Sequence, residues 1–130
     1  MIEENKVLVI DVDGTLCKEK KENEAYSDVV PQSDICNKLN EYKNNGFYII
    51  LYTSRNMRTY GGNIGKINVK TSKVLIDWLE NYKIPYDELY FGKPWCGKNG
   101  FYVDDKSIRP REFAELSYEQ INDLIVKDKL

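Results

Sequence analysis

The sequence has no histidine at any of its 130 positions. This absence excludes Ser-His-Asp and Cys-His catalysis, phosphotransfer through histidine, and the usual zinc hydrolase sites, all of which need an imidazole. Any chemistry must therefore use carboxylates, lysine, serine, threonine, cysteine or tyrosine.

The chain is also poor in cysteine, with Cys17, Cys36 and Cys96 only and no Cys-x-x-Cys spacing. An odd number of cysteines without that spacing indicates neither a disulfide framework nor a zinc site. No arginine stands six positions after any of them, so the arrangement of cysteine-dependent phosphatases is missing. No Gly-Lys pair is followed by Ser or Thr, which excludes a P-loop for nucleotide phosphates.

Long hydrophobic runs and a strong charge of either sign are missing as well. The run from Val7 to Ile10 is far too short for a membrane span or a signal-peptide core, so we expect a cytoplasmic protein that does not enter the membrane. The formal net charge of −2 disfavours nucleic acid as a partner. The length, with 42% hydrophobic and 31% charged residues, predicts one globular domain over residues 1–130.

What the sequence does contain is an alternation of short apolar runs and helical patterns. Strands are predicted at 6–12, 47–53, 88–91 and 101–103, with the first fully buried. Helices are predicted at 33–45, at 71–82, and from a Ser-x-x-Gln capping box at Ser117 to about residue 127. The charged stretch 17–30 is expected to be an exposed loop or hairpin, and the Gly- and Asn-rich stretch 55–70 a loop. This alternation predicts an α/β fold with a parallel sheet and helices on both faces.

Polar side chains follow each predicted strand. Asp11 and Asp13 end the first, Thr53 the second, Lys93 follows the third, and Asp104 the fourth. Since ligands of open α/β sheets bind at the carboxyl ends of the strands, we expect these side chains to converge.

Asp11 and Asp13 are two like charges two positions apart, and a hard cation such as Mg²⁺ is the natural means of neutralising them. A covalent mechanism suits the pair: Asp11 attacks phosphorus, while Asp13 protonates the leaving oxygen and later activates water. An Asp-Gly pair after a strand is often only a turn, so this interpretation depends on the other strand ends.

The remaining candidates would bind the phosphate and the metal. Thr53 and Ser54 offer donors to phosphoryl oxygens, Lys93 offers a positive charge, and Asp104 completes the metal shell. Lys98 and Lys106 are alternatives to Lys93, and Asp105 is a supporting residue for Asp104.

The loop after the second strand carries groups that could bind a polar substrate, namely Arg55, Asn56 and Arg58. A solvated loop with glycine-driven turns is an equally good interpretation of any single residue in it. Trp95 is either a wall of the same pocket or ordinary packing.

The ordered set Asp11-Val12-Asp13-Gly14-Thr15, Thr53-Ser54, Lys93-Pro94 and Asp104-Asp105 resembles the haloacid dehalogenase superfamily of phosphatases, over residues 6 to 106. The resemblance implies Asp11 as nucleophile, Asp13 as acid and base, Thr53 as phosphate ligand and Lys93 as stabilising cation. It also implies that Asp11, Asp104 and the Asp13 backbone carbonyl hold Mg²⁺. The implied fold is a Rossmann-like three-layer sandwich with strand order 3-2-1-4, a flap at about 16–30 and no large cap domain.

The runs 52–59 and 91–97 are similar to short members of that superfamily associated with capsular polysaccharide biosynthesis. This implies a small phosphate ester of a sugar, polyol or amino alcohol as substrate, and a homo-oligomer that closes the capless site. The alternatives are a macromolecular substrate, such as a nucleic-acid end or a phosphoprotein, and a non-catalytic phosphate-binding module. The last predicts that one strand-end group should be missing, and none is.

Overall fold

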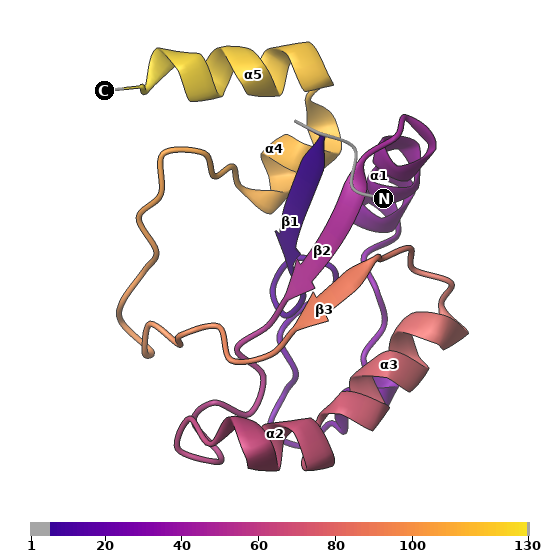
Figure 1. Cartoon of the computed structure of the whole chain (residues 1–130), viewed down its shortest axis with the longest axis vertical. Helices are drawn as coiled ribbons and strands as arrows, with labels where there is room; N and C mark the ends of the chain where they lie inside the picture. The colour runs from indigo at the N-terminus through magenta and orange to yellow at the C-terminus, as the bar shows by residue number, and fades with distance from the viewer. Residues whose placement is uncertain (1–5, 130) are drawn as a thin grey trace. The chain divides into compact units, whose positions relative to one another are not determined.

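The computed structural model describes residues 6–129 of the chain and has an α/β architecture (Figure 1). The chain divides into two compact units, Met1–Trp95 and Cys96–Leu130. The first unit contains the sheet, and the second contains two helices.

The first unit is built on a parallel sheet of β1 (Val7–Asp11), β2 (Tyr48–Tyr52) and β3 (Glu88–Tyr90), in that spatial order. In its register Asp11 lies opposite Tyr52, and Tyr52 lies opposite Tyr90. Figure 1 shows the three arrows pointing the same way, so their carboxyl ends share one edge of the sheet. The α/β class and the parallel, Rossmann-like arrangement are therefore confirmed.

Two predicted helices form with the expected buried faces. Helix α1 (Ser33–Asn44) buries Ile35, Leu39 and Tyr42, and α3 (Ser72–Asn81) buries Leu75, Trp78 and Leu79. Tyr82, the last residue of the helix predicted at 71–82, lies just beyond the end of α3 and is exposed.

Helix α2 (Ile64–Lys70) lies where the sequence predicted only a loop, so that prediction is wrong for these residues. Asn63 caps the helix by accepting a hydrogen bond from the Lys66 backbone N–H at 3.1 Å. Ile67 is fully buried, while the other side chains of α2 are exposed. A helix with one buried residue carries too little periodicity to be predicted.

The expectation that the first strand is fully buried is also wrong. Ile10 is buried, but Val7 and Val9 are 42% and 59% exposed. Alternate residues of a strand point to opposite faces, so one face of β1 is covered and the other is open.

The flap after β1 is anchored at both ends. Leu16 and Cys17 are buried, and Cys17 forms isolated bridges with Asp13 and Pro31. The Trp78 indole N–H of α3 donates to the Val29 carbonyl at 2.6 Å. Between these points lies the 3₁₀ turn η1 (Tyr26–Asp28), so only the charged middle of this stretch is the exposed loop that was expected.

The second unit contains α4 (Pro110–Glu115), which the sequence did not predict, and α5 (Tyr118–Lys127), which it did. The predicted capping box is present: the Gln120 N–H donates to Ser117 Oγ at 3.2 Å, and the Ser117 N–H donates to Gln120 Oε1 at 2.8 Å. Residues 101–103 are not in a strand, so the sheet has three strands within residues 6–129. Phe101 and Val103 are 80% and 88% exposed.

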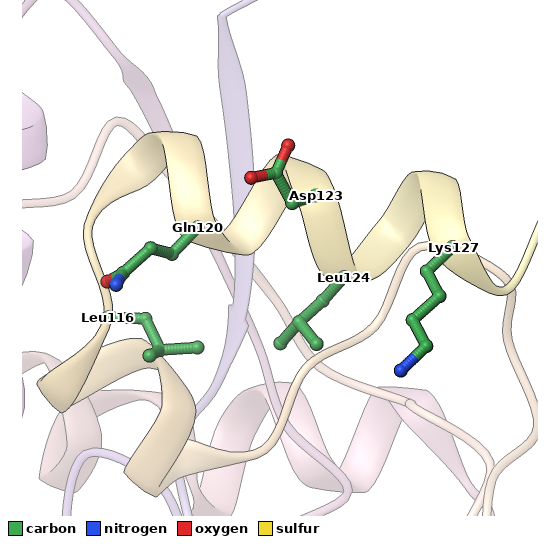
Figure 2. Close-up of a pocket in the computed structure, with 5 residues that line it drawn as sticks. All are labelled: Leu116, Gln120, Asp123, Leu124 and Lys127. Atoms are coloured by element: carbon green, nitrogen blue, oxygen red, sulfur yellow. The ribbon is translucent and has the colours of Figure 1, made fainter.

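The second unit also carries a hollow of about 240 Å³. Figure 2 shows the side chains of Leu116 and Leu124 on the same side of α5, with the polar residues around them. The lining residues are Leu116, Gln120, Asp123, Leu124 and Lys127.

Within residues 6–129, no helix combines the length and the apolar character that a membrane crossing requires.

Asp87, one residue before β3, connects three elements of the first unit. Its carboxylate accepts the Ile49 N–H of β2 at 2.8 Å and lies 2.7 Å from Lys43 Nζ of α1. Burial raises the pKa of Asp87, but the Ile49 hydrogen bond and the Lys43 ammonium outweigh that effect and hold the pKa below its ordinary value of 3.8.

We predict that Asp87→Ala lowers the free energy of unfolding at pH 7 by about 1–3 kcal/mol, since the Ile49 N–H loses its acceptor. A lowered pKa means that the stabilisation exists above the unfolded pKa of about 3.9 and is lost as the pH falls below it. Urea unfolding at pH 7 and at acid pH measures both effects. Asp77→Ala, which breaks only an exposed pair with Lys73, is the control and should change stability by less than about 0.5 kcal/mol; an equal loss in both variants would contradict the prediction.

Candidate active site

The carboxyl ends of the three strands bring Asp11 and Lys93 together. Lys93 Nζ lies 3.4 Å from Asp11 Oδ1, and both side chains are largely buried. The Lys93 backbone N–H donates to the Thr53 carbonyl at 3.1 Å, which holds the chain after β3 against the end of β2. Gly92 makes this approach possible because its φ of +84° lies in the left-handed region.

Asp11 lies in an environment that opposes its negative charge. Burial raises its pKa above the ordinary value of 3.8, the Lys93 ammonium partly counters this, and the charge of Asp13 adds to the rise. A further cation beside Asp11 would therefore be stabilising.

Asp13 is held by a second cation, Arg55. Arg55 Nη2 donates to Asp13 Oδ1 at 2.8 Å and Nε donates to Oδ2 at 3.2 Å, so the pair is bidentate. The Thr53 hydroxyl donates to the same Oδ2 at 3.2 Å and accepts the Arg55 backbone N–H at 3.0 Å. Arg55 was predicted to contact substrate, and in this structure its buried guanidinium instead holds the side chain of Asp13.

Arg55 also contacts the flap. Its guanidinium lies 4.0 Å from the ring centroid of Tyr26, within the range of a cation–π interaction. The Nη1 atom of Arg55 is buried and has no hydrogen-bond partner within residues 6–129. The sequence interpretation missed Tyr26, because a tyrosine in a charged loop has no spacing that signals a site.

A cavity of about 260 Å³ opens beside this ion pair, and all of its lining residues belong to the first unit. Five predicted residues line it, and Trp95 forms a wall with the Arg58 guanidinium 5.6 Å from its ring centroid. Thr53 is fully buried and does not line it, and Asp11 and Lys93 are not among its lining residues either. The complete lining is Asp13, Glu19, Lys20, Tyr26, Ser54, Arg55, Asn56, Arg58, Thr59 and Trp95.

Asn56 shapes the loop as well as lining the cavity. Its φ is +62°, in the left-handed region that asparagine tolerates better than most residues. Its side-chain oxygen accepts a hydrogen bond from the Thr71 hydroxyl at 2.8 Å, which ties the loop to the start of α3. The amide therefore has a structural role that its sequence position did not indicate.

Cys17 lies beside Asp13 and is not a nucleophile. Its thiol is buried, and burial together with the charge of Asp13 raises its pKa to about 12. A thiol with that pKa is protonated at neutral pH, and the buried side chain of Cys17 serves packing.

Asp104 belongs to the second unit. Its carboxylate accepts the Lys106 N–H at 2.9 Å, and this hydrogen bond lowers the pKa of Asp104 despite a small opposing effect of burial. Asp105, Lys98 and Lys106 lie in the same unit, so Lys93 is the predicted lysine that the first unit brings to Asp11.

The residues of the first unit fit a hard divalent cation. Mg²⁺ binds oxygen ligands and typically takes one or two carboxylates, completing its shell with water and substrate phosphate. The carboxylate of Asp11 and the backbone carbonyl of Asp13 supply oxygens of this kind at one strand end, and burial of Asp11 favours a compensating positive charge.

We predict that Asp13→Ala lowers the free energy of unfolding by about 3–5 kcal/mol, because it leaves the buried Arg55 guanidinium without a counter-charge. The double variant Asp13→Ala/Arg55→Met should recover much of that loss, since no unpaired charge remains. Arg58→Met is the control for removal of an arginine from the cavity wall. Chemical unfolding of the wild type, both single variants Asp13→Ala and Arg55→Met, the double variant and the control measures the effect, and additive losses in the double variant would show that the pair is not coupled.

A parallel sheet with crossover helices and a polar cavity at its carboxyl edge defines an α/β protein with a Rossmann-like arrangement and a ligand site at the strand ends. No family model and no curated protein matches the chain. A crystal structure of a protein from Vibrio cholerae, named only as a structure-determination target, is 47% identical and superposes with a TM-score of 0.91. The match covers 95% of this chain and 99% of that one, so the chain belongs to the family of this Vibrio cholerae protein.

Proposed function

We propose that the chain is a Mg²⁺-dependent phosphomonoesterase of the haloacid dehalogenase type, acting through an aspartyl-phosphate intermediate. The observation that carries the proposal is the 3.4 Å contact between Lys93 Nζ and Asp11 Oδ1, next to Asp13 on the same strand end. A carboxylate nucleophile, a second carboxylate for proton transfer and a fixed cation are the groups that this chemistry needs.

In the first step the Asp11 carboxylate attacks phosphorus and the bond to the ester oxygen breaks, while Asp13 gives its proton to the departing alkoxide. In the second step Asp13 takes a proton from water, the water oxygen attacks phosphorus, and inorganic phosphate leaves Asp11 as a free carboxylate. Lys93 stabilises the charge on the phosphoryl group, and Ser54 donates a hydrogen bond to its oxygens. The Thr53 hydroxyl, predicted to bind phosphate, holds the Asp13 carboxylate instead.

Arg55 governs when Asp13 can act. Its bidentate hold on the Asp13 carboxylate fixes that group, and an incoming phosphate offers the same guanidinium an alternative pair of oxygens. Substrate binding then releases Asp13 for proton transfer and gives Arg55 the substrate contact that the sequence predicted.

In this proposal Asp11, the Asp13 carbonyl and Asp104 hold the magnesium ion, with Asp105 in support. When bound, the ion neutralises negative charge at the phosphoryl oxygens. A fourth strand formed by residues 101–103 beside β1 would give the sheet order 3-2-1-4 and bring Asp104 to the carboxyl edge.

The cavity supports a small substrate. Its volume of about 260 Å³ and its polar lining suit the phosphate ester of a sugar, polyol or amino alcohol better than a nucleic-acid end or a phosphoprotein. The resemblance to proteins of capsular polysaccharide biosynthesis favours precursors of a surface polysaccharide among such esters.

We predict that the purified protein releases phosphate from one or more small phosphate esters with Mg²⁺, and loses this activity with excess chelator. Asp11→Asn should lower kcat by at least about 1,000-fold, because the amide cannot attack phosphorus. Circular dichroism checks that this variant folds, and Asp77→Asn on the exposed face of α3 is the control that should keep full activity. Release of phosphate by Asp11→Asn at the wild-type rate would contradict the assignment of the nucleophile.

A further inference from the structure

We propose that residues 101–103 of one copy of the chain pair with the free edge of β1 in a second copy, so that each active site receives Asp104 from the partner. The exchange itself stands on the geometry of the two units. Only the catalytic consequence for Asp104 rests on the proposed function.

The first unit offers an unprotected sheet edge. Within residues 6–129, β1 pairs with β2 alone, and its other edge has no strand against it. Val7 and Val9 on this strand are 42% and 59% exposed. An exposed apolar edge strand is a template for pairing with another chain.

The second unit offers a segment of matching chemistry. Phe101, Tyr102 and Val103 are residue types favoured in strands, yet they form no strand. Phe101 and Val103 are among the most exposed apolar side chains of residues 6–129. Added beside β1 in parallel, this segment would bring Asp104 level with Asp11 and Tyr102 level with Val9.

The connection from Lys93 makes this pairing difficult within one chain. Lys93 is fixed at the carboxyl edge by its contacts with Thr53 and Asp11, and seven residues separate it from Phe101. To lie beside β1 in parallel, Phe101 must be about 17 Å from Lys93 along the strand direction and about 14 Å from it across the strands. The straight-line distance between the two residues is then about 22 Å.

The straight line between Lys93 and Phe101 runs through the sheet. The connection must therefore pass over one face of the sheet and come back to its edge, which adds about 10 Å to its path. The eight Cα–Cα steps from Lys93 to Phe101 reach only about 26–29 Å when fully extended. Parallel strands generally need a connection of a dozen or more residues. Short connections of this kind favour exchange between copies, and a second copy removes the constraint.

The second unit also needs a partner surface for its stability. It has 35 residues, fewer than the roughly 40 that a domain usually needs to fold alone. Its hollow beside α5 is lined by the part-buried side chains of Leu116 and Leu124 (Figure 2).

A symmetric exchange, in which each copy gives and receives one segment, closes the assembly at two chains.

The first test is the mass of the wild-type protein by light scattering, which should be twice the 15.2 kDa of one chain. In the second test, Val9→Cys and Tyr102→Cys chains are unfolded together, refolded and oxidised. A cross-linked dimer should form in the mixture well above the yield of either variant alone. Val69→Cys, on exposed α2, replaces Val9→Cys as the control and should not cross-link with Tyr102→Cys.

The third test uses activity. A refolded mixture of Asp11→Asn and Asp104→Asn chains should regain roughly a quarter of wild-type activity, since one site in four combines an intact Asp11 with an intact partner Asp104. If each chain supplied its own Asp104, every site would carry one lesion and no activity would return.

A monomer mass, or a disulfide within the single chain of a Val9→Cys/Tyr102→Cys double variant, would overturn the exchange. If the wild-type protein hydrolyses no phosphate ester, the proposed function fails, and the mass and the cross-link alone decide the exchange. Dimer mass with the cross-link and recovered activity supports both proposals.

Discussion

Two carboxylates end the same strand two residues apart, and the site depends on how their repulsion is balanced. Each has its own cation: Lys93 lies 3.4 Å from Asp11, and Arg55 makes two hydrogen bonds to Asp13. The first cation comes from the end of β3 and the second from the end of β2. Because the strands are parallel and in register, their carboxyl ends place one cation beside each carboxylate, and the two cations follow different strands.

The two cations differ in ways that suit different roles. Lys93 is a single point charge at the end of a flexible chain, and in the proposed mechanism it follows the phosphoryl group as its charge develops. Arg55 is a planar, buried group held between the Asp13 carboxylate and the Tyr26 ring of the flap. Any movement of Arg55 toward a substrate is thus coupled to the flap, which is itself fixed to α3 through Trp78 and the Val29 carbonyl. The flap can respond to substrate only between its two anchors.

The sequence predicted the features that depend on local spacing along the chain. Apolar spacing located α1 and α3, the capping box located α5, and the polar residues after three strands identified Asp11, Thr53 and Lys93. It did not predict contacts that depend on packing in three dimensions. Arg55 faces Asp13 across 42 positions and Tyr26 across 29, and no local pattern reports such a pairing. The exposure of Val7 and Val9 was missed for a related reason: an apolar run indicates a strand that is buried somewhere but does not say what covers it.

The composition of β1 indicates what could cover its exposed edge. Natural proteins protect an exposed sheet edge with lysine, proline, a bulge or a very short strand. The strand Val7-Leu8-Val9-Ile10-Asp11 has five residues and none of these devices, and its one charge is the acidic group of the site. A bare edge of this kind makes an isolated first unit prone to association with itself. Since the same chain carries an exposed segment of strand-forming residues followed by Asp104 and Asp105, specific pairing with that segment both covers the edge and brings acidic groups to the end where Asp11 lies. Stability of the sheet and completion of the site would then have one physical cause.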